Sequence, residues 1–225
     1  GIGGTYVTVA VLYWIAAIAA MLISASKEDT IRQKKGVFQD MGDGFKALGK
    51  DKVLLWLLGL SLAGVSLGQP YQVLLPDFAA DTLHIPATGL GLLMAVVALG
   101  GAVGNLMVAC LKERASLGKW LLGLSVASGA GLVWLAASST LSTSLVALFF
   151  LGITGLPFFT INQVLVQKLA PPEVRGRILS LYMLTWGVMP IGIIASTKLA
   201  DAVGIVWPLL LSGSLLVVIT IATVL

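Results

Sequence analysis

The chain has 225 residues, of which 58% are hydrophobic and 11% are charged, and its formal net charge at pH 7 is +4. Soluble domains carry about a quarter of charged residues, so the composition excludes a water-soluble globular protein. The positive charge does not indicate nucleic-acid binding, because the basic residues lie between apolar runs and do not form a polar face interleaved with aromatic residues.

Cys110 is the only cysteine of the chain and His84 is its only histidine. A single cysteine cannot form an internal disulfide, and one histidine cannot supply the ligand cluster of a zinc site. The sequence therefore predicts no cofactor and no metal site. Because Gly1 and Leu225 both lie inside apolar runs, and the first run lacks the basic region and cleavage site of a signal peptide, we expect the chain to be a fragment.

Stretches of roughly 20 apolar residues, the length that crosses a ~30 Å hydrocarbon core, recur along the chain. They predict transmembrane helices at residues 3–24, 53–76, 87–111, 119–137, 143–167, 177–199 and 204–225. Glycine and proline inside them are tolerated where neighbouring helices satisfy the freed backbone groups. We therefore expect an all-α membrane protein with seven transmembrane helices.

The connections alternate in basic charge. Every lysine and arginine except Lys198 lies near the connections that follow the first, third and fifth spans. The positive-inside rule places those connections in the cytoplasm. The sequence thus predicts a multi-pass protein of the cell (inner) membrane, with its first residue outside and its last residue in the cytoplasm.

The connection at residues 26–52 is the longest polar segment, and it divides the chain into one helix and six. Its apolar residues recur at steps of three and four, namely Phe38, Met41, Phe45 and Leu48. This pattern is typical of an amphipathic helix at a membrane surface. An ordinary solvated linker is the alternative.

One helix, a basic linker with an amphipathic helix, and six helices with short loops resemble part of a major facilitator superfamily transporter: its sixth helix, central loop and C-terminal half. Three runs resemble the subgroup that includes the enterobactin exporter and macrolide efflux proteins: VFQDMGDGFKALGKD at 37–51, GLGLLMAVVALGGAVG at 89–104 and QKLAPPEVRGRILSLY at 167–182. The loop at 112–119 departs from the superfamily's fuller signature, because it lacks an Asp before its basic residues.

The resemblance implies a transporter whose two halves rock around a central site, with each half built of two inverted three-helix repeats. Residues 1–25 would then be the last helix of a preceding N-terminal half, residues 26–52 the cytoplasmic linker, and residues 53–225 the C-terminal six-helix half. Its two repeats would be spans two to four and spans five to seven.

The resemblance also implies that the second and fifth spans line the central cavity, and polar side chains concentrate in both. One face of the second span holds Ser61, Gly64, Gly68, Tyr71 and Gln72. Small residues and amides also occur where membrane helices simply pack together, so packing is the alternative for this face. Gln69 lies off the stripe, and Pro70 marks a kink.

On the fifth span, a stripe at steps of three and four continues from Gly152 through Leu156, Thr160, Gln163 and Gln167. Asn162 lies about 100° from Gln163 around the helix, so the two side chains cannot both face one solute. We expect Gln163 to face the cavity and Asn162 to bond a neighbouring helix. Asn162 also remains a candidate cavity residue, because it fits the family's pattern of an Asn in this helix.

Two further motifs are a candidate helix-packing pair and a candidate gate. Gly100 and Gly104 form a Gly-x-x-x-Gly pair that favours close helix packing. The turn after the fifth span carries Glu173, Arg175 and Arg177. By the resemblance these three residues are candidates for ion pairs at an inner gate, whereas their alternative role is to hold the loop in the cytoplasm.

The sequence therefore predicts a secondary active transporter that works by alternating access, with efflux of a small amphipathic compound, such as a drug or siderophore, as the expected direction. Its expected partners are that solute, the lipid bilayer and the missing N-terminal half, and no nucleic acid. The alternatives are a non-transporting helical bundle and a membrane-embedded enzyme, although an enzyme needs clustered catalytic groups that the sequence lacks. If the protein is a proton-coupled antiporter, its protonatable residue is expected outside this chain, because Asp77, Asp81 and Asp201 lie at span ends or in loops.

Overall fold

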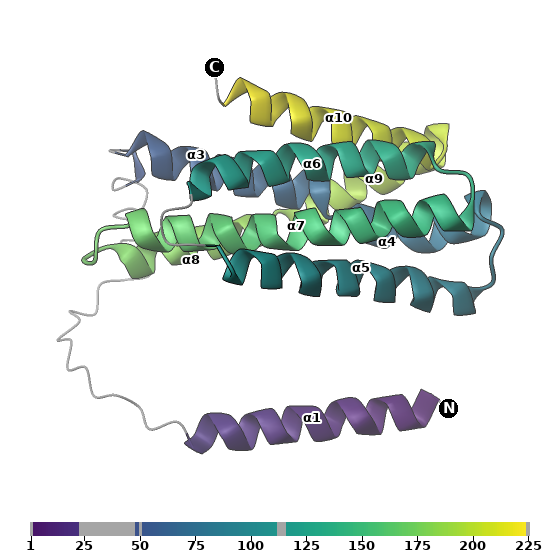
Figure 1. The fold of residues 1–225 in the computed structure, drawn as a ribbon, viewed down its shortest axis with the longest axis horizontal. Helices are drawn as coiled ribbons and strands as arrows, with labels where there is room; N and C mark the ends of the chain where they lie inside the picture. The colour runs from purple at the N-terminus through teal and green to yellow at the C-terminus, as the bar shows by residue number, and fades with distance from the viewer. Residues whose placement is uncertain (1, 23–47, 50, 112–115, 224–225) are drawn as a thin grey trace. The chain divides into compact units, whose positions relative to one another are not determined.

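A computed structural model describes residues 2–22, 48–49, 51–111 and 116–223 (Figure 1). Within these ranges the chain is helical and contains no strand. It divides into two compact units, residues 1–36 and 37–225. The predicted amphipathic helix falls almost entirely outside the described residues.

In the first unit, helix α1 runs over Ile2–Leu22. Its 21 residues include no Asp, Glu, Lys or Arg, so the helix has the composition of a membrane span. The apolar run predicted at 3–24 is therefore helical over its described part.

The second span is a chain of four helical segments that extends over Lys52–Thr82. It begins with α3 (Lys52–Ala63), continues as a π-helix η1 (Gly64–Gly68), and ends with α4 (Tyr71–Asp77) and a π-helix η2 (Phe78–Thr82). At its start, the side chain of Asp51 accepts hydrogen bonds from the backbone N–H groups of Val53 (2.9 Å) and Leu54 (3.3 Å). This arrangement is a helix N-cap.

This span is longer than the sequence predicted, because the helix does not end at residue 76. Pro76 lies inside α4, and the chain continues into η2, where Phe78 and Ala79 are buried. Burial of these two apolar side chains favours the additional helical turn.

The remaining helices follow the predicted order. Helix α5 comprises Ala87–Ala109, α6 Leu117–Ala137, and α7 Leu141–Leu169. The sixth span is interrupted after Trp186, so that it consists of α8 (Arg175–Trp186) and α9 (Met189–Val203), and α10 comprises Val206–Ala222. Pro190 lies in the first turn of α9, where its missing N–H costs no hydrogen bond.

By length and composition, five helices among the described residues are long and apolar enough to cross a membrane. They are Lys52–Thr82, Gly89–Ala109, Leu117–Ala137, Leu141–Leu169 and Arg175–Val203. Val206–Ala222 and, within α1, Val9–Ala19 are shorter apolar helices. The architecture is thus that of an all-α membrane protein, and the count of seven membrane crossings stays a prediction.

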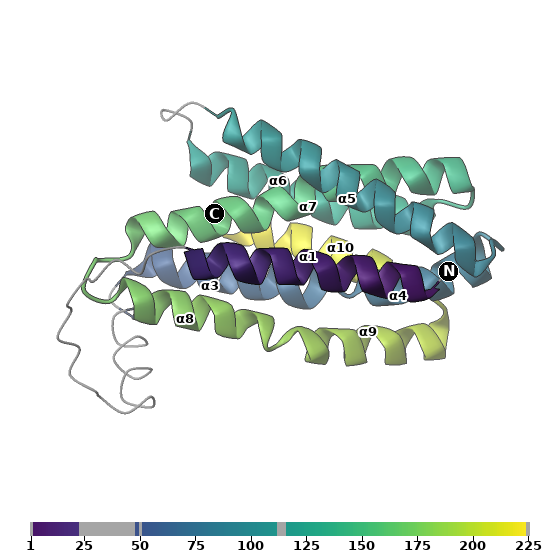
Figure 2. The same ribbon diagram turned by 90° about the horizontal axis from the view of Figure 1, so that it is seen from below.

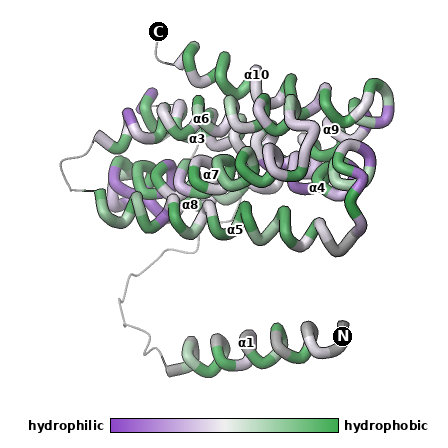
Figure 3. Tube along the Cα trace, turned by 45° about the vertical axis from the view of Figure 1, so that its right-hand side comes forward, coloured by the Kyte–Doolittle hydropathy of each residue, from purple (hydrophilic) through white to green (hydrophobic). Residues whose placement is uncertain are grey.

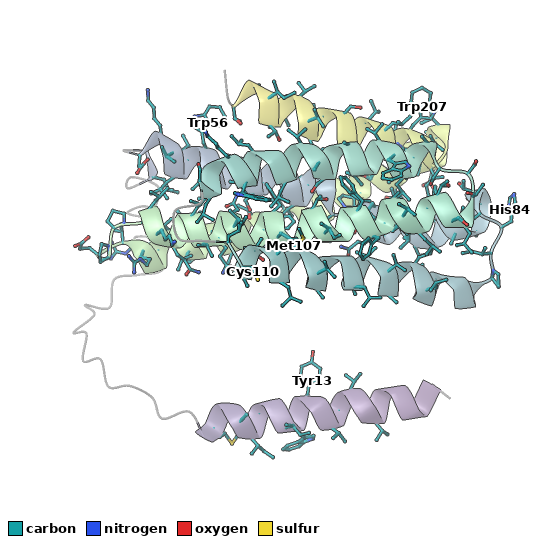
Figure 4. The ribbon with its side chains drawn as sticks, viewed as in Figure 1. Tyr13, Trp56, His84, Met107, Cys110 and Trp207 are labelled. Carbon is teal, nitrogen blue, oxygen red and sulfur yellow. The ribbon has the colours of Figure 1, made fainter. Side chains whose placement is uncertain are left out.

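The helices of the second unit lie alongside one another (Figure 2). Helix α7 packs against α5 and α6, α6 packs against α10, and the η1 turn packs against α9 and α10. Hydrophobic residues extend along the helices, whereas hydrophilic residues gather toward the helix ends (Figure 3). The exposed indoles of Trp56 on α3 and Trp207 on α10 lie toward opposite ends of the unit (Figure 4), as expected for side chains at the two membrane interfaces.

Three helix pairs come into backbone contact at glycine. A Cβ atom added to Gly100 of α5 would meet the carbonyl oxygen of Phe149 on α7. One added to Gly192 of α9 would meet the carbonyl oxygen of Ser66 in η1, and one added to Gly129 of α6 would lie 2.7 Å from the carbonyl oxygen of Gly213 on α10. Small residues that permit such approach are typical of helix contacts in membranes.

The interior of this unit consists of two apolar clusters that follow one another along the helices. One includes Leu132 of α6 and Leu151 of α7, and the other includes Leu121 of α6 and Phe158 of α7. Since both clusters use α6 and α7, their boundary falls near the middle of these two helices.

Candidate functional site

A cavity of about 320 Å³ lies at that boundary. Small, amide, hydroxyl, aromatic and aliphatic residues line it. From η1 to α5 they are Gly64, Gly68, Gln69, Tyr71, Gln72, Leu75, Met94, Val97 and Ala98. From α6 to α10 they are Ser125, Ser128, Leu132, Leu151, Gly152, Gly155, Leu156, Phe158, Phe159 and Leu216. The lining residues lie near the middle of each helix, so the cavity is at mid-depth of the bundle.

Half of the candidate cavity residues line this space. Gly64, Gly68, Tyr71, Gln72 and Leu156 belong to its wall. The other five candidates lie elsewhere: Ser61, Thr160, Asn162, Gln163 and Gln167. The second span therefore contributes more of the expected face than the fifth.

Gln69 reaches the cavity although its position in the sequence is off the stripe. The side chain of Gln72 donates from Nε2 to Gln69 Oε1 over 2.7 Å, and both amides lie on the wall. Gln69 follows directly after η1 and lies three residues before Gln72, a spacing at which side chains on a helix are neighbours.

Ser61 and Asn162 tie helices together. The hydroxyls of Ser61 and Thr185 lie 3.2 Å apart, linking α3 to α8, and Asn162 donates from Nδ2 to the carbonyl oxygen of Leu57 over 3.1 Å, linking α7 to α3. The side chains of Ser61 and Asn162 are fully buried. Hydrogen bonds of this kind are a usual means of joining membrane helices.

The other members of the fifth-span stripe are only partly covered. Thr160 donates to Asn105 Oδ1 on α5 over 2.8 Å and to the carbonyl oxygen of Leu156 over 3.2 Å. Gln163 is half-buried, and Gln167 is exposed. The stripe thus lies on the accessible side of α7, and Asn162 lies on its covered side.

Sequence reasoning overlooked the contribution of α6. Ser125 and Ser128 of this helix both line the cavity, and both are buried. The Ser125 hydroxyl lies 2.7 Å from that of Thr220 on α10, whereas the Ser128 hydroxyl has no partner among the described residues. The available signal was two serines three residues apart inside an apolar span, where polar side chains rarely face lipid.

The candidate gate residues surround the start of α8. Glu173 and Arg175 are exposed, and Arg175 donates from Nε to the carbonyl oxygen of Ala170 over 3.4 Å. Arg177 is half-buried in the first turn of α8. All three therefore lie at the helix end that the sequence predicts to be cytoplasmic.

Gly104, like Gly100, faces α7. A Cβ atom added to Gly104 would lie 2.5 Å from the carbonyl oxygen of Ile153 and 2.6 Å from Pro157 Cγ. From the other side, a Cβ atom added to Gly152 would meet the carbonyl oxygen of Val97. These glycines thus serve the α5 to α7 contact.

The described residues contain no group of three or more His, Cys, Asp or Glu side chains that could hold a metal ion. Cys110 is exposed at the end of α5, and His84 is exposed in the turn before that helix (Figure 4).

Apolar helices of membrane-spanning length, joined by buried hydroxyl and amide contacts, define a multi-pass α-helical membrane protein. The chain belongs to the Major Facilitator Superfamily, since the family's sequence profile matches residues 1–191 and, in a second alignment, residues 71–225. The resemblance drawn from the sequence is confirmed.

Curated relatives are efflux proteins by name. The multidrug efflux pump Tap of Mycolicibacterium fortuitum is 27% identical over 194 residues, which cover 85% of this chain and 47% of the pump. Macrolide efflux protein A of Streptococcus pyogenes is 28% identical over 194 residues, which cover 81% of this chain and 46% of that protein. The chain thus spans about half the length of the curated relatives that it matches.

Proposed function

We propose that this chain is part of a secondary active transporter that exports small amphipathic compounds, such as drugs or siderophores, by alternating access. Its membership of the Major Facilitator Superfamily and its similarity to proteins named for multidrug and macrolide efflux support this proposal. The observation that carries it in the structure is the cavity at mid-depth of a membrane bundle, the depth at which secondary transporters bind solute.

The helix contacts support an organisation in two inverted three-helix repeats. If spans two, three and four correspond to spans five, six and seven, the α5 to α7 contact corresponds to the contact of α9 with η1. The same correspondence exchanges α6 and α10, so the contact between these two helices is its own counterpart. All of these contacts are present. Each is also made at a glycine, at Gly100, Gly192 and Gly129.

In this proposal the stripe of Leu156, Thr160, Gln163 and Gln167 faces the central cavity between the two halves of the transporter. Arg175, with Glu173 and Arg177, belongs to a gate at the cytoplasmic end. The basic connections lie in the cytoplasm of a cell whose inner membrane holds the protein.

Efflux by the intact protein tests the proposal. Cells that lack other efflux pumps are loaded with a fluorescent amphipathic drug. The loss of drug from the cells is followed with and without an uncoupler, which dissipates the proton gradient and the membrane potential. Expression should accelerate the loss, and the uncoupler should abolish the acceleration, because a secondary transporter draws on an ion gradient. Equal loss with and without the protein, at verified abundance in the membrane, would contradict the proposal.

A further inference from the structure

Ser128 carries a buried hydroxyl that the packing of the helices leaves unused. Its side chain is 7% exposed, and its Oγ has no hydrogen-bond partner among the described residues. By contrast, the buried hydroxyl of Thr154 donates to the carbonyl oxygen of Phe150 over 2.9 Å. An unsatisfied buried hydroxyl costs about 1–3 kcal/mol, so a ligand that bonds it would recover part of that cost.

Glycines of the cavity wall leave open space beside Ser128 and Leu216. A Cβ atom added to Gly155 of α7 would lie 4.0 Å from Ser128 Oγ, and one added to Gly68 would lie 3.9 Å from Leu216 Cδ2. Both distances are ordinary van der Waals contacts, so neither glycine is required by helix packing at that point. Gly64 differs, because its added Cβ would lie 2.6 Å from Phe158 Cε1.

The rest of the wall suits an uncharged ligand. The residues described as lining the cavity include no Asp, Glu, Lys, Arg or His. Phe158 and Phe159 meet edge to face, with ring centroids 4.9 Å apart, and both belong to the wall. The hydrogen bond between Gln72 and Gln69 uses one donor and one acceptor, so each amide keeps capacity for a further bond.

We propose that this cavity is a binding subsite formed within the six-helix unit itself, for an uncharged and largely apolar group that carries a hydrogen-bond acceptor such as a ketone, ester or amide carbonyl. Ser128 donates to the acceptor, and the aromatic rings and Met94 contact the apolar part. This inference rests on the proposed function and names the substrate class. The inner wall of the subsite comes from α6 and α10, the fourth and seventh spans. It does not come from the surface that would face the other half of the transporter.

The size and polarity of the cavity define the class further. A volume of about 320 Å³ is near the lower end of the ~300–1,000 Å³ typical of ligand pockets, so the subsite accepts a compact molecule or one arm of a larger compound. A cationic group is excluded from this position, because burial of a charge without a counter-charge is strongly unfavourable. The charged part of an amphipathic substrate would remain outside.

Benzophenone is a suitable probe, because it is a neutral ketone with two aromatic rings and is itself photoreactive. On irradiation its carbonyl abstracts a hydrogen atom from a nearby C–H bond, and the two carbon radicals couple, so each label adds one whole benzophenone. The intact protein is purified in detergent, irradiated at increasing benzophenone concentrations, and digested for mass spectrometry.

Two methionines of α5 provide an internal comparison. Met94 lines the cavity and is 48% exposed, whereas Met107 is 56% exposed and does not line it. Labelling of Met94 should saturate with probe concentration. Labelling of Met107 should rise in proportion to the probe, as expected for contact with probe dissolved in the detergent.

Substitutions then separate the subsite from nonspecific labelling. Ser128→Ala should weaken the saturable component by about fivefold, equivalent to ~1 kcal/mol for one hydrogen bond. Gly155→Leu should remove it by filling the space, and Gly155→Ala, whose methyl fits without a clash, should weaken it. Gly59→Leu is the control, because an added Cβ there meets nothing within 4 Å and Gly59 does not line the cavity.

Labelling of Met94 that never saturates, or that is unchanged in Ser128→Ala and both Gly155 variants, would overturn the subsite. The efflux assay gives a result that is independent of the labelling experiment. Efflux with nonsaturable labelling would leave the proposed function standing and remove the subsite, whereas saturable labelling without efflux would keep the subsite and remove the transport function.

Discussion

Gly129 of α6 and Gly213 of α10 face each other so closely that a Cβ atom on either would strike the backbone of the other. The added atom would lie 2.7 Å from the carbonyl oxygen of Gly213 in the first case and 2.5 Å from the carbonyl oxygen of Gly129 in the second. The two backbones therefore meet without intervening side chains.

Replacing either glycine by alanine should force these two helices apart. We expect Gly129→Ala and Gly213→Ala each to cost about 1–3 kcal/mol of stability, the usual range for overpacking. The measurement is the thermal unfolding midpoint in detergent. Gly123→Ala on the same helix is the control, because an added Cβ there meets nothing within 4 Å. Equal midpoints for all three variants would show that the helices adjust freely.

The hydrogen bond from Asn162 to the Leu57 carbonyl should contribute to stability. Asn162→Ala is expected to cost about 1 kcal/mol, since hydrogen bonds between membrane helices average ~0.6 kcal/mol and reach ~1.7. Gln163→Ala is the matched control, because the Gln163 side chain is half-buried and, among the described residues, makes no hydrogen bond to α3. If the Gln163 variant unfolded at the lower temperature, the roles of the two amides would be reversed.

The exposed face of α7 should react with a hydrophilic thiol reagent. In a Cys110→Ser background, single cysteines at 156, 160 and 163 should be modified, and substrate should protect them. Cysteines at 158 and 161 should not react, because Phe158 is 3% and Ile161 1% exposed, whereas Leu156 is 39% exposed. Labelling confined to 158, 161 and 165 would place the proposed central cavity between the two halves on the opposite face of α7.

Arg175 should matter for transport more than for insertion. Arg175→Ala is expected to slow efflux at normal abundance, because the other basic residues of the connections that the sequence predicts to be cytoplasmic would still set the topology. Arg175→Lys should restore efflux only in part, since an ammonium does not reproduce the planar donor fork of arginine. Lys168→Ala is the control for loss of one basic residue. Full efflux by the Arg175→Ala variant would remove this side chain from the gate.

Reporter fusions should reveal the direction of the helices. Alkaline phosphatase is active only outside the cytoplasm, so a fusion near Asp81 should be active and a fusion near Gln33 should be inactive. This expectation follows from the charge of the connections, because Gln33 lies among basic residues and Asp81 does not. The reverse pattern would invert the topology.

The apolar runs of this chain determine much of its architecture by themselves. Hydropathy and length are local properties, and a backbone in lipid must satisfy its own hydrogen bonds, so each long apolar run forms a helix. The runs at 87–111 and 119–137 accordingly agree with α5 and α6 within two residues at each end. The motif runs likewise predicted the superfamily, because such motifs are contiguous in sequence.

The tertiary structure decided which polar residues share a cavity. Gln69 joins the wall through its hydrogen bond with Gln72, and the second span continues to Thr82, with Phe78 buried in a cluster that includes residues of other helices. The burial of Phe78 depends on those helices, so it cannot be read from the spacing of residues along one helix. Ser125 and Ser128 look equivalent in sequence, yet in the part of the chain that the structure describes the Ser125 hydroxyl has a partner, Thr220, and the Ser128 hydroxyl has none. Whether a buried hydroxyl is satisfied depends on the neighbouring helix, and the packing of α6 against α10 and α7 leaves Ser128 facing open space.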